Sequence, residues 1–279
     1  MMGEAKEPIR LAILGNPVKQ SKSPVIHQQF AQQFNLDLEY LAIECTVVDF
    51  PEQVQKLAES GARGCNITAP FKHEAWEAAH RTSARAERAR AANTLVFEEK
   101  DDWFADTTDG RGLIADLVRH QGRELPGSRI LIMGAGGATA GILSDLLQEK
   151  PAELVIGNRT EERARHLADR FSNLGPVVSS SLKQLDNLAP FDIFINATSL
   201  GHIGKVPVLP DSLLVPGALC YDLNYGPAAN PLREHCQARG LAYRDGTGML
   251  VEQAAVSFKL WTGLEPDTLP VLQALRKDH

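Results

Sequence analysis

An apolar run that breaks directly into a glycine-rich turn, at residues 129–139, constrains the fold of this chain more than any other feature. Residues 129–133 read as a buried strand, and Gly134-Ala-Gly136-Gly137-Ala-Thr139 follows as a turn that opens a helix. Backbone N–H groups at a helix start, with the positive end of the helix dipole, favour a bound pyrophosphate. Gly134 permits the tight turn, and Gly136 lets the backbone approach a ligand. Thr139 stands where the usual fingerprint has a third glycine or alanine, and such turns also form for packing alone.

The next predicted strand distinguishes between two cofactors. Residues 153–157 lead into Asn158-Arg159-Thr160, and an NAD site usually has an acidic residue here, about 20 residues past the glycines, for the ribose hydroxyl. Arg159 takes that place instead, with Arg163 one helical turn further on. Two guanidiniums suit a 2′-phosphate, which needs charged, forked donors. The sequence therefore favours NADP, although both arginines are also compatible with a solvated helix start.

Length and charge exclude several classes of protein. A chain of 279 residues suits two domains. Its net charge of −6 argues against a general nucleic-acid binder, whose affinity depends on neutralising phosphates. No apolar stretch approaches the length of a membrane span, so we expect no membrane partner. The polar first ten residues lack the apolar core of a signal peptide, which predicts a cytoplasmic protein.

The cysteines and histidines argue against two further kinds of site. Cys45, Cys65, Cys220 and Cys236 show neither close pairing nor a Cys-x-x-Cys spacing. The histidines are scattered, without the spacing of metal ligands. We therefore predict reduced, mostly buried thiols, no disulfide framework and no metal site.

Alternating strands and helices predict an α/β fold with two domains. The first domain, residues 1–109, is expected to contain strands at 9–14, 38–43 and 65–68, helices from Ser23-Pro24, at 51–60 and at 72–92, and a hairpin of 94–97 with 103–105. Ser23 is predicted to cap its helix, with Pro24 in the first helical position.

The second domain, residues 110–244, contains the glycine turn. Its expected strands are 129–133, 153–157, 176–179, 191–196, 219–223 and 241–243, with helices at 138–149, 161–172 and 228–239. This order predicts a parallel, Rossmann-type sheet with right-handed crossovers. A helix at 110–120 is expected to bridge the domains. Residues 245–279 are expected to return to the first domain as two helices and to complete it, with a ligand cleft between the domains.

Four polar clusters lie at strand ends of the first domain. They are Ser21-Lys22-Ser23-Pro24, the segment 66–72, Asn93-Thr94 and the segment 107–110. Each is explained singly by a cap, a turn or a solvated lysine. Together they supply hydroxyls, amides, one ammonium and one carboxylate, which suits a small, anionic, hydroxyl-rich substrate.

These motifs, taken in order along nearly the whole chain, resemble those of the shikimate dehydrogenase family. The matching segments are Gly15-Asn-Pro17, Ser21-Lys-Ser23-Pro24 with His27, Asn66-Ile-Thr68-Ala-Pro70-Phe-Lys72, Asn93-Thr94, Thr108-Asp109-Gly110, Gly134 to Thr139, Asn158-Arg159-Thr160, Asn196-Ala-Thr198-Ser199, Tyr221-Asp222-Leu-Asn-Tyr225 and Asp245-Gly246 to Gln253. The resemblance implies a substrate domain followed by a Rossmann-type NADP-binding domain. It also implies reversible, NADPH-dependent reduction of 3-dehydroshikimate to shikimate in aromatic amino-acid biosynthesis.

The resemblance assigns roles to individual residues. Lys72 would be the catalytic acid–base residue, paired with Asp109. The substrate contacts would be Ser21 and Ser23 at the carboxylate, Tyr225 near it, and Thr68, Lys72, Asn93, Asp109 and Gln253 at the hydroxyl face. The cofactor contacts would be Gly134, Ala135, Gly136, Gly137 and Ala138 at the pyrophosphate, Asn158, Arg159, Thr160 and Arg163 around the 2′-phosphate, and Leu223 and Gly246 at the nicotinamide.

The chain departs from the family pattern at four positions. The family commonly has histidine at Gln20, asparagine at Thr107 and methionine at Leu223, and some members have an acidic residue at Ala84. The two serines, the lysine and the aspartate are retained, so these departures bear on affinity more than on the reaction.

Three other functions stay open at this point. A quinate/shikimate dehydrogenase of dual specificity would share the constellation, although Arg159 argues against NAD. A non-catalytic NADP-binding regulator would keep the fold, but Lys72 and Asp109 are both present. A folate-type dehydrogenase of similar plan fits the serine pair less well. The sequence is compatible with a homodimer and does not establish one.

Overall fold

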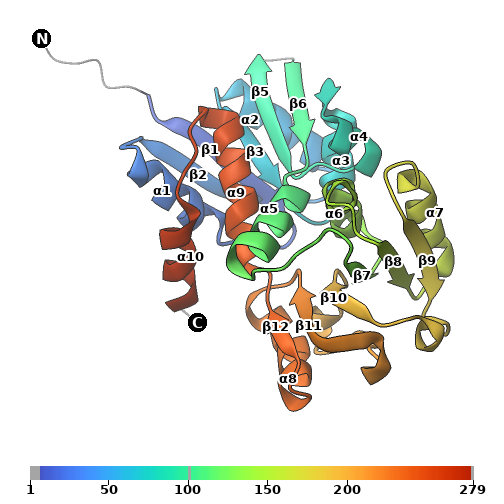
Figure 1. The fold of residues 1–279 in the computed structure, drawn as a ribbon. Helices are drawn as coiled ribbons and strands as arrows, with labels where there is room; N and C mark the ends of the chain where they lie inside the picture. The colour runs from blue at the N-terminus through green and yellow to red at the C-terminus, as the bar shows by residue number, and fades with distance from the viewer. Residues whose placement is uncertain (1–6, 100–101, 278–279) are drawn as a thin grey trace, which may run out of the picture. The chain divides into compact units, whose positions relative to one another are not determined.

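The computed structural model describes residues 7–99 and 102–277, so the predicted domain limits at residues 1 and 279 lie outside the described residues. The chain divides into two compact units (Figure 1). The first unit comprises residues 7–112 with 251–277, and the second comprises residues 113–250. Each border falls inside a helix, α5 (Asp109–Ala115) or α9 (Thr247–Thr262), so both helices contribute residues to both units.

The first unit is built on a six-stranded mixed sheet with the order β2-β1-β3-β5-β6-β4. Its strands are β1 (Ile9–Gly15), β2 (Leu38–Glu44), β3 (Gly64–Ile67), β4 (Arg81–Thr82), β5 (Thr94–Glu99) and β6 (Asp102–Asp106). Strands β1, β2 and β3 are parallel, whereas β5 runs antiparallel to both β3 and β6. The predicted hairpin of β5 and β6 is therefore present, and its strand β5 pairs with β3 at the edge of the parallel part of the sheet.

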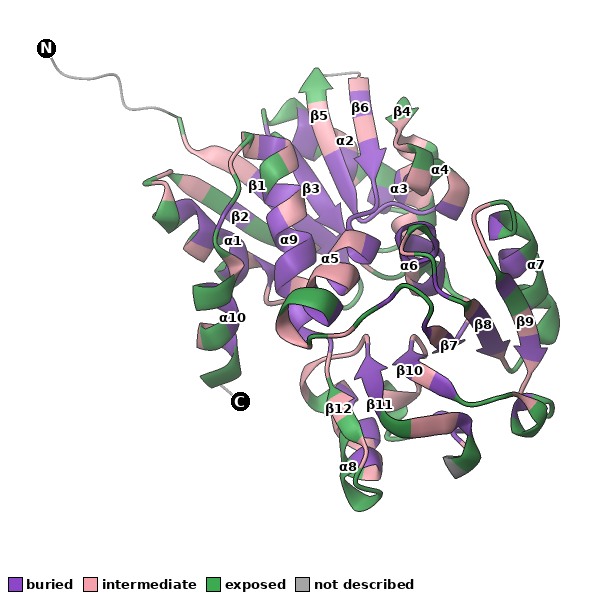
Figure 2. Ribbon diagram, viewed as in Figure 1, coloured by how far each residue is buried: buried purple, intermediate pink, exposed green. Residues whose placement is uncertain are grey.

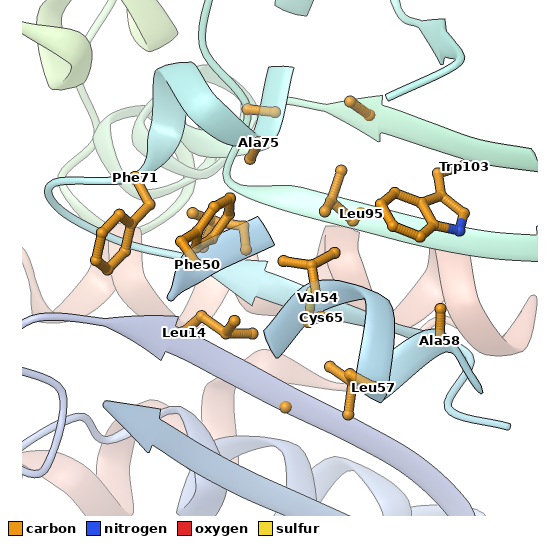
Figure 3. Packing of buried hydrophobic residues seen from close by; sticks show 14 of the residues in the cluster. Leu14, Phe50, Val54, Leu57, Ala58, Cys65, Phe71, Ala75, Leu95 and Trp103 are labelled. Carbon is orange, nitrogen blue, oxygen red and sulfur yellow. The ribbon is translucent and has the colours of Figure 1, made fainter. Parts of the chain in front are cut away.

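Residues on both faces of β1 and β3 are buried, and alternate residues of these strands point to opposite sides of the sheet. Ala12 and Leu14 of β1 pack with Phe50 and Val54 of α2 (Phe50–Glu59) and with Phe71, which precedes α3 (Lys72–Ala78). Figure 3 shows the packing of Leu14, Phe50, Val54 and Phe71. Buried apolar side chains of this size each contribute about 1.5–3 kcal/mol, so this face anchors the turns that follow β1 and β3.

The opposite face of the sheet is covered by α9 and by α1 (Ser23–Gln33), and α10 (Thr268–Lys277) packs on α1. Leu11 and Ile13 of β1 pack there with Tyr40 and Trp261. Trp261 also donates its indole N–H to the backbone oxygen of Leu95 at 2.9 Å. The return of the C-terminal segment to the first unit thus places α9 directly on the sheet.

The predicted continuous helix at residues 72–92 is wrong. The segment is divided into α3, strand β4 and α4 (Ala84–Ala89). Arg81 pairs with Phe104 of β6, and Ser83 begins a new helix by accepting a hydrogen bond from the Ala86 N–H at 3.1 Å. A tertiary strand pairing and a serine cap thus override the helix propensity of an alanine- and arginine-rich stretch.

The expected cap of α1 also differs from the structure. Ser23 is the first residue of the helix and does not cap it with its side chain. Instead, the Oγ atom of Ser21 accepts a hydrogen bond from the Ser23 N–H at 3.2 Å. Lys22 takes the capping position in a helical conformation, and Pro24 follows inside the first turn, where its missing N–H costs nothing.

The second unit is a six-stranded, fully parallel sheet with the order β12-β11-β10-β7-β8-β9. Its strands are β7 (Arg129–Met133), β8 (Glu153–Asn158), β9 (Val177–Ser181), β10 (Phe191–Asn196), β11 (Leu214–Asp222) and β12 (Ala242–Arg244). The chain starts in the middle of the sheet, builds outward to β9 and then returns to add β10 beside β7. This is the Rossmann order, whose ligand site lies where the strand order reverses.

Helices α6 (Gly137–Gln148), α7 (Glu161–Phe171) and α8 (Asn230–Ala238) follow β7, β8 and β11. The central strands are buried, as Figure 2 shows for β8, and Leu154, Val155 and Ile156 are each 0% exposed. The predicted helix at 110–120 is α5 followed by a π-helical turn, Asp116–His120. The predicted helix at 228–239 is a 3₁₀ turn, Gly226–Ala229, followed by α8. Within the described residues, no helix is both long and apolar enough to cross a lipid bilayer.

Candidate functional site

Strand register brings the polar clusters of the first unit to one edge of its sheet. Asn66 of β3 pairs with Thr94 of β5, and Thr94 pairs with Asp106 of β6. Because β5 runs antiparallel to both neighbours, its first residue lies beside the last residues of β3 and β6. The turn after β3, the residues before β5 and the turn after β6 therefore meet at this edge.

Lys72 and Asp109 form an ion pair at this edge. The Lys72 Nζ donates a hydrogen bond to the Asp109 Oδ2 across 2.5 Å, and the two side chains are 20% and 8% exposed. Lys72 is the first residue of α3, and Asp109 is the first residue of α5. An ammonium held this way retains hydrogens for a substrate oxygen, which is the requirement for a general acid.

The Asn93 amide ties this pair to α9. Its Nδ2 lies 2.9 Å from the Asp109 Oδ1, 2.9 Å from the Thr108 Oγ1 and 3.0 Å from the Gln253 Oε1. Its Oδ1 accepts a hydrogen bond from the Thr108 N–H at 2.9 Å. The structure thus brings together Lys72, Asn93, Asp109 and Gln253, four residues expected at the substrate. They come from segments that are far apart in the sequence.

Ser21, Ser23 and Thr68 lie in the turns after β1 and β3. Ser23 is 2% exposed, whereas Ser21 and Thr68 are partly exposed. The Thr68 N–H donates to the Leu14 oxygen at 2.9 Å, which continues the pairing of β1 with β3 by one step. Among the described residues, no hydrogen bond joins these three side chains to Lys72.

A buried carboxylate, Asp106, holds the turn that carries Asp109. Asp106 is 3% exposed and accepts hydrogen bonds from the Ser83 Oγ at 2.5 Å, the Thr107 N–H at 2.8 Å and the Arg111 guanidinium at 2.6 Å. These bonds fix the chain on both sides of Asp109. Asp106 was not predicted as a site residue, although it directly precedes the 107–110 cluster.

In the second unit, the glycine turn after β7 has the geometry of a nucleotide cradle. Gly134 has a φ of +114°, and a Cβ there would lie 2.8 Å from the Ala197 oxygen, so only glycine fits. Thr139 Oγ1 donates to the Gly134 oxygen at 2.8 Å, so this residue braces the turn from within the helix. A Cβ at Gly136 or Gly137 would meet no described atom within 4 Å.

The arginines lie one strand further along the same edge. Met133 of β7 pairs with Gly157 of β8, so the segment 158–160 follows directly beside the glycine turn. The Asn158 amide donates to the Thr160 oxygen at 2.9 Å and shapes this segment. Arg159, Thr160 and Arg163 are exposed, which leaves both guanidiniums accessible to a phosphate.

The ends of β10 and β11 are locked together by a buried carboxylate. The Asp222 Oδ1 accepts hydrogen bonds from the Asn196 amide at 3.0 Å and from the Asn224 amide at 2.8 Å. Burial raises the pKa of Asp222 to about 6, and the hydrogen bonds from Asn224 and Asn196 act in the opposite direction. The Leu223 N–H donates to the Asn196 oxygen, and the Gly246 N–H donates to the Asn224 oxygen, each at 2.9 Å. Leu223 and Gly246, both expected at the nicotinamide, are therefore held by one network.

The residues of the second unit fit a dinucleotide phosphate. Gly136 caps α6 without a side chain, so the start of this 12-residue helix offers bare N–H groups to an anion. The unfilled space over Gly136 and Gly137 matches the close approach that a pyrophosphate needs. Ala135 and Ala138 complete the segment around the helix start. Arg159 supplies a donor set suited to a 2′-phosphate.

Tyr225 lies in the second unit, whereas the other residues expected at the substrate lie in the first. Burial raises the pKa of its hydroxyl. Within the described part of the chain, no group of three or more histidine, cysteine, aspartate or glutamate side chains is placed to hold a metal ion.

Several members of the first-unit network were not predicted as site residues. Asn66 accepts a hydrogen bond from the Tyr40 hydroxyl at 2.7 Å, and Ser257 contacts both Thr94 and Thr108. One sequence signal exists for Ser257, because it follows Gln253 by four residues and so shares its helix face. The others become neighbours only through strand register, which a single sequence does not define.

Three features together define a class of protein. The chain has a Rossmann sheet with a bare glycine turn, an arginine at the next strand end, and a lysine paired with an aspartate. The class is that of two-unit α/β oxidoreductases that use a nicotinamide dinucleotide. Three family models match this chain: the shikimate dehydrogenase substrate binding domain over residues 13–95, the shikimate / quinate 5-dehydrogenase over residues 116–204, and the shikimate 5'-dehydrogenase C-terminal domain over residues 246–276.

Known proteins resemble the chain over nearly its full length. A relative from Alkalilimnicola ehrlichii, named shikimate dehydrogenase (NADP(+)), is 45% identical over 270 residues, which is 96% of this chain and 99% of the relative. The Ael1 enzyme from Pseudomonas putida is 42% identical, with a TM-score of 0.87 over 96% of this chain and 98% of its own. Shikimate 5-dehydrogenase from Thermus thermophilus, solved with NADP(H) and shikimate, is 30% identical, with a TM-score of 0.84 over 96% and 99%. The chain belongs to the shikimate dehydrogenase family.

Proposed function

We propose that this protein catalyses the reversible, NADPH-dependent reduction of 3-dehydroshikimate to shikimate in aromatic amino-acid biosynthesis. The observation that carries the proposal is the 2.5 Å contact between Lys72 and Asp109, next to the amides of Asn93 and Gln253. Relatives named shikimate dehydrogenase (NADP(+)) that match nearly the whole chain support the same reaction.

The two domains expected from the sequence would bind the substrate and the cofactor separately. The substrate domain is residues 1–109, completed by 245–279, and the NADP-binding domain is residues 110–244. Ser21, Ser23 and Tyr225 would hold the substrate carboxylate, since hydroxyls donate well to it. Thr68, Asn93 and Gln253 would hold the hydroxyl face, together with Lys72 and Asp109.

NADPH, when bound, supplies the hydride to the substrate carbonyl carbon. As negative charge grows on the carbonyl oxygen, the Lys72 ammonium stabilises it and donates a proton to it. Asp109 keeps Lys72 in place, because its Oδ2 accepts a hydrogen bond from the Lys72 Nζ across 2.5 Å. In the opposite direction, neutral Lys72 accepts the proton from the substrate hydroxyl.

The direct test is the variant Lys72→Ala. Turnover should fall at least about 100-fold, because positioned acid–base groups contribute about 10²–10⁴, while NADPH affinity should be almost unchanged. Lys56→Ala is the matched control, since Lys56 is an exposed lysine of the same unit that pairs with Glu52 on α2. Near-normal turnover in Lys72→Ala would remove the lysine from the mechanism.

Assays of the parent protein with shikimate and quinate, each with NADP⁺ and NAD⁺, separate the remaining functions. Turnover of shikimate with NADP⁺ alone supports the proposal. Comparable turnover of quinate, or use of NAD⁺, would indicate the dual-specificity enzyme, and no turnover of either acid would leave the folate-type dehydrogenase and the non-catalytic NADP-binding protein. A homodimer and a cytoplasmic location stay predictions, which sedimentation and fractionation test.

A further inference from the structure

Ser257, on α9, lies at the centre of the buried polar network of the first unit and is 0% exposed. Its Oγ lies 2.8 Å from the Thr94 Oγ1 and 3.2 Å from the Thr108 Oγ1. It also accepts a hydrogen bond from the Asn66 amide at 3.1 Å and lies within 3.2 Å of the Gln253 backbone oxygen. The four contacts connect β3, β5, the turn after β6 and α9, and a hydroxyl with one hydrogen and two lone pairs makes three of them at a time.

The partners of Ser257 are the residues that orient the Asn93 amide. The Asn93 Oδ1 contacts the Thr94 hydroxyl at 3.0 Å and the Thr108 hydroxyl at 3.2 Å. Thr108 also donates to the Gln253 Oε1 at 3.1 Å. The single hydrogen of each threonine hydroxyl can therefore point to Ser257 or to an amide oxygen. Which of these acceptors it uses depends on whether the Ser257 hydroxyl is present.

We propose that Ser257 is a positioning residue, which fixes the side-chain amides of Asn93 and Gln253 for the hydroxyl groups of the substrate. The identity of that substrate rests on the proposed function. Loss of the Ser257 hydroxyl leaves Thr94 and Thr108 each with one partner fewer in a buried setting, where an unpaired polar group is costly. Both threonines then compete for the Asn93 Oδ1, and Thr108 also reaches the Gln253 Oε1, so the two amides lose their fixed orientation.

The effect belongs to substrate binding more than to proton transfer. Lys72 contacts the Oδ2 of Asp109, whereas the network reaches Asp109 through its Oδ1 and Asn93. Removing the Ser257 hydroxyl therefore leaves the acid–base contact in place. Ser257 acts only through its neighbours and takes no part in the chemical step.

The experiment measures KM and kcat separately for Ser257→Ala. KM for shikimate should rise about tenfold, as expected when one buried polar partner is lost, while kcat changes less than about threefold and KM for NADP⁺ stays constant. Ser257→Cys keeps the side-chain size with a weaker donor and acceptor, so its KM should lie between those of the parent and the alanine variant. It also preserves the test if the alanine variant does not fold.

Ser144→Ala is the matched control. Ser144 is a buried serine on α6, 1% exposed, and its hydroxyl has no hydrogen-bond partner among the described residues. Ser144→Ala deletes the same hydroxyl group without breaking a hydrogen-bond network. The KM values for shikimate and for NADP⁺ should therefore both match those of the parent. A shikimate KM within twofold of the parent in Ser257→Ala would overturn the positioning role.

A second readout does not depend on the substrate. The side-chain amide signals of Asn93 and Gln253 in ¹⁵N NMR spectra should shift or broaden in Ser257→Ala and stay unchanged in Ser144→Ala. Unchanged signals in Ser257→Ala would refute the inference even if the parent turned over shikimate. Altered signals in Ser257→Ala, together with a parent protein that does not use shikimate, would support positioning and refute only the proposed function.

Discussion

The buried imidazole of His27 makes the stability of the first unit depend on pH. His27 lies on α1, is 0% exposed and stacks on Tyr40 with ring centroids 4.6 Å apart. Trp261 and Phe30 lie 5.4 and 5.9 Å away, and neither ring nitrogen has a hydrogen-bond partner among the described residues. Burial lowers the pKa of His27 from 6.5 to about 3, and the Asn66 side chain acts in the opposite direction.

The lowered pKa sets both the sign and the size of the effect. In the unfolded chain the imidazole takes up a proton as the pH falls through 6.5, whereas in the folded protein it stays neutral down to about pH 3. The unfolded state therefore binds more protons in this window, and the free energy of unfolding falls as the pH falls. Each pH unit below 6.5 costs about 1.4 kcal/mol, so the step from pH 7.5 to pH 5.0 costs about 2 kcal/mol.

The assay is urea unfolding at pH 7.5 and pH 5.0 for the parent and for His27→Phe. Other groups also titrate, so the quantity of interest is the difference between the two proteins in their loss of stability. Between the two pH values the parent should lose about 2 kcal/mol more unfolding free energy than His27→Phe. Repacking around the larger ring costs about 1–3 kcal/mol, but it does so at both pH values and cancels in this comparison.

His202→Gln serves as the control for this prediction. His202 is exposed, so its imidazole meets water in both states, and its removal should leave the pH-dependent loss as large as in the parent. Equal losses in the parent and in His27→Phe would refute the reasoning, because the folded protein would then accept a proton on His27 at no cost.

Three further predictions concern the second unit. Arg159→Ala should lower the preference for NADPH over NADH about 10- to 100-fold in kcat/KM, since a hydrogen bond to a charged group contributes about 1.5–3 kcal/mol. Arg163→Ala offers the comparison at the same strand end. An unchanged ratio of kcat/KM in both variants would place the 2′-phosphate elsewhere. Gly134→Ala should lower the melting temperature and weaken NADPH binding, because its Cβ would lie 2.8 Å from the Ala197 oxygen at a φ of +114°; calorimetry with and without NADPH measures both, and normal values would mean that the turn relaxes easily. Thr139→Val should cost about 1 kcal/mol in urea unfolding, since its 2.8 Å bond to the Gly134 oxygen is lost; a stability equal to that of the parent would show that the bond does not brace the turn.

Much of the fold could be predicted from the sequence because its signals are local. The apolar run at 129–133 and the glycines after it define a strand, a turn and a helix within eleven residues, and the structure confirms them. The stretch 72–92 has an equally clear local signal and misleads. There the deciding interaction is the pairing of Arg81 with Phe104, twenty-three residues away in the chain, which no local propensity contains.

The candidate site shows the same limit at the level of single residues. The motifs name Lys72, Asn93, Asp109 and Gln253, and the structure places these four in contact. Ser257 has no motif of its own, since a serine on a buried helix face is unremarkable until strand register puts two threonine hydroxyls beside it. Chemistry can thus be recognised from residue types, whereas the groups that orient it depend on contacts between distant strands.

Each unit has its proposed site at the strand ends of its own sheet, but the groups proposed to bind the ligand differ between the two units. At the end of β7 the proposed binding group is the backbone itself, and Gly134 admits no side chain without a clash. At the ends of β3 and β6 the proposed binding groups are side chains, and these depend on buried partners such as Asp106 and Ser257. Substitutions in the first unit should therefore act through graded changes in orientation. Substitutions of Gly134 should act through steric conflict, so even the smallest side chain, alanine, should have the full effect.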